Sequence, residues 1–232
     1  MGDMIFYYHP FAKKIVGRTY DVVLASERAR TDPAYEKLRA NGHIHGDASK
    51  ACSLLRKSFG EAVAGISDGR MFYRMMRPAK QVLIAGREED VHPFHTGHAQ
   101  QMRGFQFNRA TGLHKIIVSG WKIKLQGEYR VTKFDEPIVE AVKGASHFQI
   151  VSFVVGVDFE EKTFEGNYDT SERIEHGSGK VEPFELNAEV PAGYPVYFNV
   201  IAIRQFKLVN GTFHALNNST GQAADIVEIW NR

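Results

Sequence analysis

The stretch "YPVYFNVIAIRQFKLVNGTFHALNN", residues 194–218, contains the clearest strand and turn patterns of this chain. In its first half, both sets of alternating positions are largely apolar. One set is Val196, Phe198, Val200 and Ala202, and the other is Tyr197, Asn199, Ile201 and Ile203. A strand that is apolar on both faces is buried on both, which predicts a central place in a sheet. The Asn210-Gly211 pair then predicts the tight turn of a β-hairpin.

Strand patterns continue on both sides of this stretch, from residue 112 to the end of the chain. The clearest of them read "EYRVTKF", "SHFQIVSFVVGVDF", "KTFEGNYDT", "KVEPFELNAEV" and "AADIVEIW". About seven short strands with regularly spaced turns are typical of a β-sandwich of immunoglobulin or fibronectin type III size. The Cys…Trp…Cys pattern of immunoglobulin domains is absent, so the likeness concerns topology alone.

Residues before 112 are mainly helical in pattern, although the first 27 predict one or two strands. Asp32 and Pro33 predict a helix start, and Asn41-Gly42 predicts its end. Two amphipathic helices follow, and their apolar stripes favour packing as a helical hairpin. The stripes comprise Ala48, Ala51, Cys52, Leu55, Phe59, Ala62, Val63 and Ile66, and then Met71, Phe72, Met75, Met76, Ala79, Val82 and Leu83. Pro78 should kink or break the second helix.

These patterns predict an α+β protein with a helical, basic N-terminal part over residues 1–111 and an antiparallel β-sandwich over residues 112–232. The charge distribution agrees with this division. Residues 1–120 carry 18 Lys and Arg against 11 Asp and Glu, while the remaining residues carry 11 against 16. Such a split suggests two segments with different surfaces. The basic surface could bind an acidic partner, or the two oppositely charged halves could dock on each other.

The segment "REEDVHPFHTGHAQ", residues 87–100, holds the candidate metal ligands His92, His95 and His98. Zinc sites need several N, S or O donors that converge on one ion. On one regular helix, a three-residue spacing turns successive side chains about 60° apart, so convergence requires a loop. Pro93 and Gly97 favour a loop. The alternative is a solvated connector, and the H-E-x-x-H and Cys-x-x-Cys patterns are both absent.

Arg70, Arg74 and Arg77 form the second candidate site, a basic face on the helix that carries the Met-rich stripe. Such a face could contact nucleic-acid phosphates. The alternative is the charged outer face that any amphipathic helix presents to water. No helix-turn-helix, RRM, KH or zinc-finger pattern accompanies the arginines.

The sequence offers little for catalysis and nothing for a membrane. Cys52, the single cysteine, lies in an apolar stripe and is expected to be a buried hydrophobe. "HGSGKV", residues 176–181, has Val181 where a phosphate-binding loop needs Ser or Thr, so a hairpin turn is expected instead. The N-terminus has no secretory signal pattern and no apolar run could span a bilayer, which predicts a cytoplasmic protein without a membrane partner.

The layout resembles an uncharacterised bacteroidete family with a basic N-terminal helical part and a C-terminal β-sandwich-like domain. The residues that carry this resemblance are "AKKIVGRTYDVV" (12–23), "SKACSLLRKSF" (49–59) and "HFQIVSFVVGVDF" (147–159). The family has no assigned activity, so the resemblance implies an architecture and a bacterial source but no functional residues.

We expect a non-catalytic binding or structural module that acts through protein–protein contacts, either with a partner protein or by self-association. This expectation rests on fold-level analogy. The first alternative is an enzyme that uses a divalent metal at the His-rich loop, and no other cofactor is expected. The second is a nucleic-acid-associated protein that uses the basic helix face.

Overall fold

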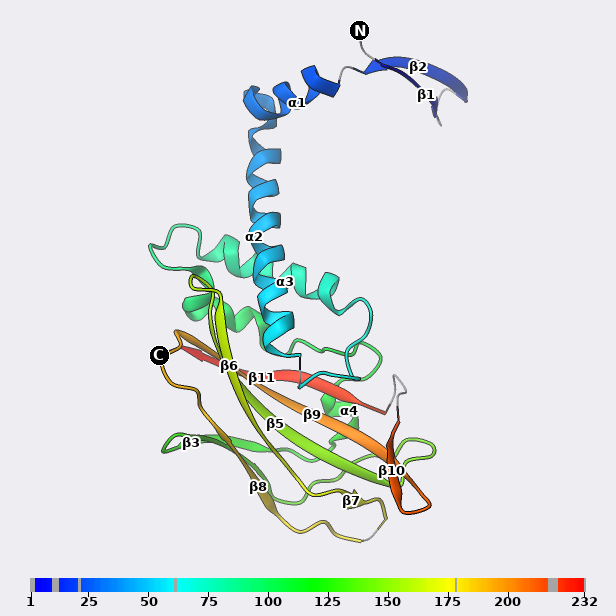
Figure 1. The fold of residues 1–232 in the computed structure, drawn as a ribbon, viewed down its shortest axis with the longest axis vertical. Coiled ribbons are helices and arrows are strands. Elements are labelled where there is room, and N and C mark those ends of the chain that lie inside the picture. The colour runs from blue at the N-terminus through cyan, green and yellow to red at the C-terminus, as the bar shows by residue number, and fades with distance from the viewer. Residues whose placement is uncertain are drawn as a thin grey trace. The chain divides into compact units, whose positions relative to one another are not determined.

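The computed structural model describes residues 3–9, 13–20, 22–60, 62–177, 179–216 and 221–231. The chain forms two compact units, Met1–Gly46 and Asp47–Arg232 (Figure 1). This division corrects the boundary that the sequence pattern predicts after residue 111. The physical reason is that the helical residues from Ala48 onward share one hydrophobic core with the large sheet.

The smaller unit begins with a two-stranded antiparallel hairpin, β1 (Asp3–His9) and β2 (Lys14–Tyr20). The predicted early strands are therefore confirmed up to Tyr20. The residues that follow, α1 (Val22–Thr31), are helical where the sequence pattern suggests a strand.

The predicted helix start is confirmed, since the side chain of Asp32 accepts a hydrogen bond of 2.9 Å from the amide of Ala34 and caps the 3-10 turn η1 (Pro33–Tyr35). The predicted end at Asn41-Gly42 is wrong, because α2 runs without interruption over Glu36–Ser58. A glycine costs a helix interior only about 1 kcal/mol, and the buried face that follows offsets that cost.

The larger unit contains a six-stranded antiparallel sheet (Figure 1). Its main path is β10 (Thr212–Ala215), β9 (Val196–Val209), β5 (His147–Asp158) and β6 (Thr163–Thr170), while β11 (Ala223–Asn231) pairs with β9 and β7 (Ile174–Glu175) pairs with β5. The central place predicted for β9 is confirmed by three neighbouring strands. Asn210 and Gly211 both have positive φ, 50° and 78°, as the turn between β9 and β10 requires.

A second antiparallel sheet contains β3 (Lys122–Gln126), β4 (Tyr129–Phe134) and β8 (Phe184–Glu189). It packs on one face of the large sheet, together with the short helix α4 (Leu113–Ile116), around Phe148, Ile150 and Ile201. Thr132 and Ser152, which are fully buried, bring their hydroxyl oxygens within 3.1 Å of each other between the sheets. The fold is thus α+β with antiparallel sheets, as expected.

Helices cover the opposite face of the large sheet. The alternate positions Val151, Phe153 and Val155 of β5 join one core with α2, α3 (Met71–Ala85) and the 3-10 turns η2 (Pro93–His95) and η3 (Gly97–Met102). Both predicted apolar stripes are buried there, except that Phe72 and Leu83 are partly exposed. The helices therefore form a layer on the sheet and not a separate domain. α3 also continues through Pro78, although a break was one of the two predicted outcomes.

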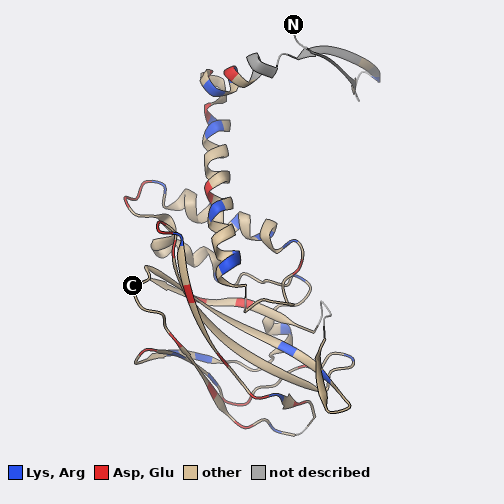
Figure 2. Cartoon of the chain, viewed as in Figure 1, with Lys and Arg blue, Asp and Glu red and all other residues tan. Residues whose placement is uncertain are grey.

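Charged side chains are sparse on the central strands (Figure 2). β5 carries Asp158 and no other charged residue apart from its histidine, and β9 carries Arg204 and Lys207. This distribution follows from burial on both faces, because an unpaired charge there would lose its hydration.

Candidate functional sites

Of the three histidines of the predicted metal site, His92 precedes the 3-10 turn η2, His95 ends it, and His98 lies in η3. His92 caps η2, with its Nδ1 atom accepting a hydrogen bond of 3.3 Å from the amide of Phe94. His95 accepts one of 2.9 Å at Nε2 from the amide of Phe159. Both imidazole rings contact the Phe159 ring, with centroid distances of 5.3 and 6.0 Å. These contacts hold the connection between α3 and η3 against the end of β5.

The structure brings His92 and His95 together but not His98. The first two rings have centroids 5.2 Å apart, whereas Nε2 of His98 lies 2.8 Å from Oε1 of Glu89. Burial lowers the pKa of both His92 and His95, which agrees with neutral rings that accept amide hydrogen bonds. Within the described part of the chain, no group of three or more His, Cys, Asp or Glu side chains is placed to hold a metal ion. The predicted three-histidine site therefore lacks convergent donors.

The predicted basic face divides into two kinds of arginine. Arg74 donates hydrogen bonds to Asp68 at 2.5 Å, to the carbonyl of Gln106 at 2.6 Å and to that of Phe107 at 3.1 Å. Its guanidinium also lies 5.3 Å from the centre of the Phe105 ring. Arg70 and Arg77 remain exposed. Arg74 thus ties α3 to residues 105–107, and the face presents two exposed arginines where three were predicted.

An uncovered apolar surface occurs on the hairpin of the smaller unit. Tyr8 and Ile15 are directly opposite each other in the β1–β2 register, so their side chains share one face. They are 61% and 72% exposed. Tyr35 and Leu38, further along the same unit, are 39% and 63% exposed. None of the residues of this unit whose exposure is described is buried.

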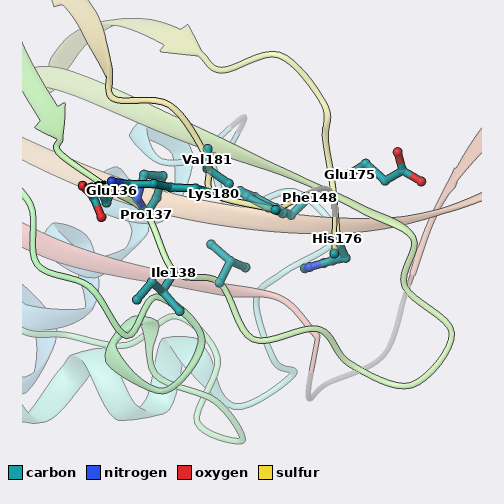
Figure 3. A pocket seen from close by; sticks show the side chains of 11 residues that line it. Glu136, Pro137, Ile138, Phe148, Glu175, His176, Lys180 and Val181 are labelled. Atoms are coloured by element: carbon teal, nitrogen blue, oxygen red, sulfur yellow. Dashed lines mark ion pairs between the residues drawn. The ribbon is translucent and has the colours of Figure 1, made fainter.

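A cavity of about 260 Å³ lies beside His176, with apolar walls that include Pro137, Ile138 and Phe148 (Figure 3). Lys180 and Glu136 form an ion pair of 2.5 Å at this site. The Nε2 atom of His176 lies 3.2 Å from Oε1 of Gln205.

The buried amide of Gln205 determines the role of this histidine. Its Oε1 atom also accepts from the amide of Val142 at 3.1 Å, and its Nε2 atom donates to the carbonyl of Glu140 at 2.9 Å. Because a carbonyl oxygen can only accept, Nε2 of His176 must carry the hydrogen. Burial also lowers the pKa of His176, which favours the neutral ring with a lone pair on Nδ1. His176 therefore adds a neutral hydrogen-bond acceptor to a cavity whose lining also includes the carboxylates of Glu136 and Glu175.

A second cavity, of about 410 Å³, lies between α4, β11 and the residues around β3. Its walls include Leu113 and Trp121, and Asp225 of β11 lies among the lining residues although it is only 8% exposed. Oδ2 of Asp225 accepts a hydrogen bond of 3.1 Å from the amide of Leu113. Burial raises the pKa of Asp225 to about 6, against the lowering effects of that hydrogen bond and of His114.

Sequence reasoning singled out neither Asp225 nor the histidine of the first cavity. A signal for Asp225 was present, since "AADIVEIW" reads as a buried strand and Asp225 is a carboxylate at an inward position of it. Such a residue is expected to be paired or functional. The role of His176 depends on Gln205, 29 residues away, and no local pattern indicates that contact.

Comparisons with protein families, curated proteins and solved structures find no match to this chain. The resemblance to a bacteroidete family therefore stays a prediction, and function must be argued from the geometry. Among the described residues, no helix is both long enough and apolar enough to cross a membrane.

Proposed function

We propose that this protein is a non-catalytic module that assembles through protein–protein contacts, with the hairpin face of Tyr8 and Ile15 packing on the same face of a second copy. The observation that carries the proposal is the pair of directly opposed apolar side chains that are 61% and 72% exposed.

The smaller unit needs such a partner for its stability. Within the described residues, β1 and β2 pair only with each other. An isolated two-stranded hairpin is at best marginally stable in water. Units of about 40 residues usually need a disulfide, a metal or oligomerisation. The single cysteine, Cys52, excludes an internal disulfide, and of the two other routes the proposal takes oligomerisation.

Packing two identical faces together satisfies this need. Fully burying a side chain such as Ile contributes about 1.5 to 3 kcal/mol, and each copy supplies both a Tyr and an Ile. A two-fold arrangement uses the same residues twice, so one exposed face is sufficient. The interface would be small, and we therefore expect weak, concentration-dependent association.

The larger unit would serve as the rigid body of this assembly. Its two antiparallel sheets pack around Phe148, Ile150 and Ile201, which supports a β-sandwich. The immunoglobulin-like or fibronectin-like topology remains part of the proposal.

Analytical ultracentrifugation of the full chain across the micromolar range tests the proposal. We expect the wild type to dimerise and Ile15→Lys to remain monomeric, because a charged side chain would be buried against its own copy. Val118→Lys is the matched control, since Val118 is an apolar residue of the larger unit that is 57% exposed. A wild type that stays monomeric, or a dimer that survives Ile15→Lys, would contradict the proposal.

A further inference from the structure

The cavity around Asp225 has a buried carboxylate whose hydrogen-bonding capacity is largely unused. Oδ2 accepts one hydrogen bond from the amide of Leu113, whereas Oδ1 is buried and has no hydrogen-bond partner among the described residues. An ionised carboxylate offers about four acceptor positions. A buried carboxylate that lacks a donor loses hydration without compensation.

The other titratable groups that line this cavity are Glu228, Arg103 and His114. Glu228 is held by Arg130, whose Nε donates to Oε2 at 2.8 Å and which also forms an ion pair with Oε1. Arg103 donates from Nε to the carbonyl of Val227 at 3.0 Å and is exposed, as is His114. Asp225 forms no ion pair with any described residue, so its carboxylate is the acceptor that a ligand would complete.

We propose that this cavity binds a small organic ammonium ion, with an ammonium N–H donating to Oδ1 of Asp225 and the apolar body lying against Leu113, Trp121 and Ile123. The volume of about 410 Å³ lies in the ordinary range of small-molecule sites. A cation is favoured over a neutral donor because hydrogen bonds between charged partners are about twice as strong. The ring of Trp121 adds an aromatic surface that favours cations.

The proposal goes beyond self-association and is independent of it. The cavity belongs to the larger unit, and none of its lining residues comes from Met1–Gly46. Either proposal can therefore fail without the other.

Isothermal titration calorimetry of the full chain at pH 7.5 with phenethylammonium chloride tests the proposal. The neutral isostere 2-phenylethanol is the matched probe. We expect saturable binding of the ammonium ion with a millimolar or lower Kd, and at least tenfold weaker binding of the alcohol. Asp225→Asn should weaken ammonium binding at least tenfold. Asp135→Asn, which changes an exposed carboxylate paired with Lys122, should leave the Kd unchanged.

A second measurement needs no variant of Asp225, in case that substitution affects folding. Ammonium binding to the wild type should weaken about tenfold from pH 7.5 to pH 5 as the carboxylate gains a proton. His114→Gln, which removes the histidine that lines the cavity, should retain this pH dependence. Equal affinity for amine and alcohol, no binding of the amine at 10 mM (roughly the weak limit of useful affinity), or full binding to Asp225→Asn would overturn the proposal.

Discussion

The two units of this chain differ in how their apolar residues are covered. In the larger unit, β5 and β9 are buried on both faces, between helices on one side and a second sheet on the other. In the smaller unit, the described side chains of Tyr8 and Ile15 face solvent from one side of a two-stranded hairpin. The larger unit thus contains its own core, whereas no described side chain of the smaller unit is buried, and this contrast is the basis of the proposed self-association.

The largest expected effect is a difference in the loss of stability when one aromatic residue of each unit is replaced by Ala. Phe198 is fully buried, with its ring centroid 5.6 Å from that of Phe59 of the helical layer. Phe198→Ala should lower the free energy of unfolding by about 3 to 5 kcal/mol because it leaves a cavity in the core. Tyr8→Ala should lower it by less than about 0.5 kcal/mol in dilute solution. Urea unfolding followed by circular dichroism measures the free energy of unfolding of both variants. Similar losses of stability would contradict the contrast between a buried Phe198 and an exposed Tyr8.

The next effect tests whether Arg74 belongs to the core of the larger unit. Arg74→Ala should lower the free energy of unfolding by about 2 kcal/mol, since it leaves Asp68 and two carbonyl groups without a charged donor. Arg77→Ala, an exposed position on the same helix, should change stability by less than about 0.5 kcal/mol. The same urea unfolding experiment measures both variants. Equal losses of stability would show that Arg74 belongs to a solvated face of the helix.

A comparable effect concerns Asp225, a buried carboxylate of the larger unit whose Oδ1 atom has no hydrogen-bond partner among the described residues. The pKa of Asp225 in the folded protein is about 6, above its ordinary value of 3.8. The folded state therefore binds this proton more tightly than the unfolded chain, so the contribution is present below about pH 4 and is lost as pH rises through about 6.

Asp225→Asn should thus raise the free energy of unfolding at pH 8, by roughly 2 kcal/mol. Each pKa unit of the shift corresponds to about 1.4 kcal/mol. The NH2 group of the new Asn side chain offsets part of this gain because it is buried without an acceptor. The gain should disappear at about pH 4, where the wild-type carboxyl is neutral. Urea unfolding at both pH values measures it, with Asp135→Asn as the exposed control. A variant that is less stable than the wild type at pH 8 would show that the carboxylate is well satisfied.

The smallest expected effect on stability concerns the hairpin face. Ile15→Lys should change the free energy of unfolding by less than about 0.5 kcal/mol in dilute protein, because the side chain is 72% exposed in a single copy. Thermal unfolding at several protein concentrations distinguishes the wild type from the variant. The wild-type Tm should rise with concentration and that of the variant should not, since association stabilises only the folded form.

Several elements could be predicted from the sequence because the information for them is local. The alternation in β9 and the Asn210-Gly211 turn each depend on a few neighbouring residues, and so do the helical stripes around Cys52 and Met75. Errors arose where distant contacts override local preference. Gly42 reads as a helix end, yet α2 continues because its later turns are buried against the sheet.

The candidate sites also depend on contacts between residues far apart in the chain. The spacing of His92, His95 and His98 is visible in the sequence, but the sequence does not show that His95 accepts from the amide of Phe159, 64 residues away. Arg74 has the same helical spacing as Arg70 and Arg77, but it alone of the three donates hydrogen bonds to the carbonyl groups of Gln106 and Phe107 among the described residues.

The α+β class, the central strand, the tight hairpin turn and the apolar faces of the two main helices can all be predicted from the amino-acid sequence, since periodicity and turn chemistry act over a few residues. The division of the chain after Gly46, and the cavities that Asp225 and His176 border, become visible only in the folded molecule. The physical reason is that burial and convergence depend on contacts between residues far apart in the chain. A local pattern can indicate that a side chain is unusual, but only the folded packing decides what it meets.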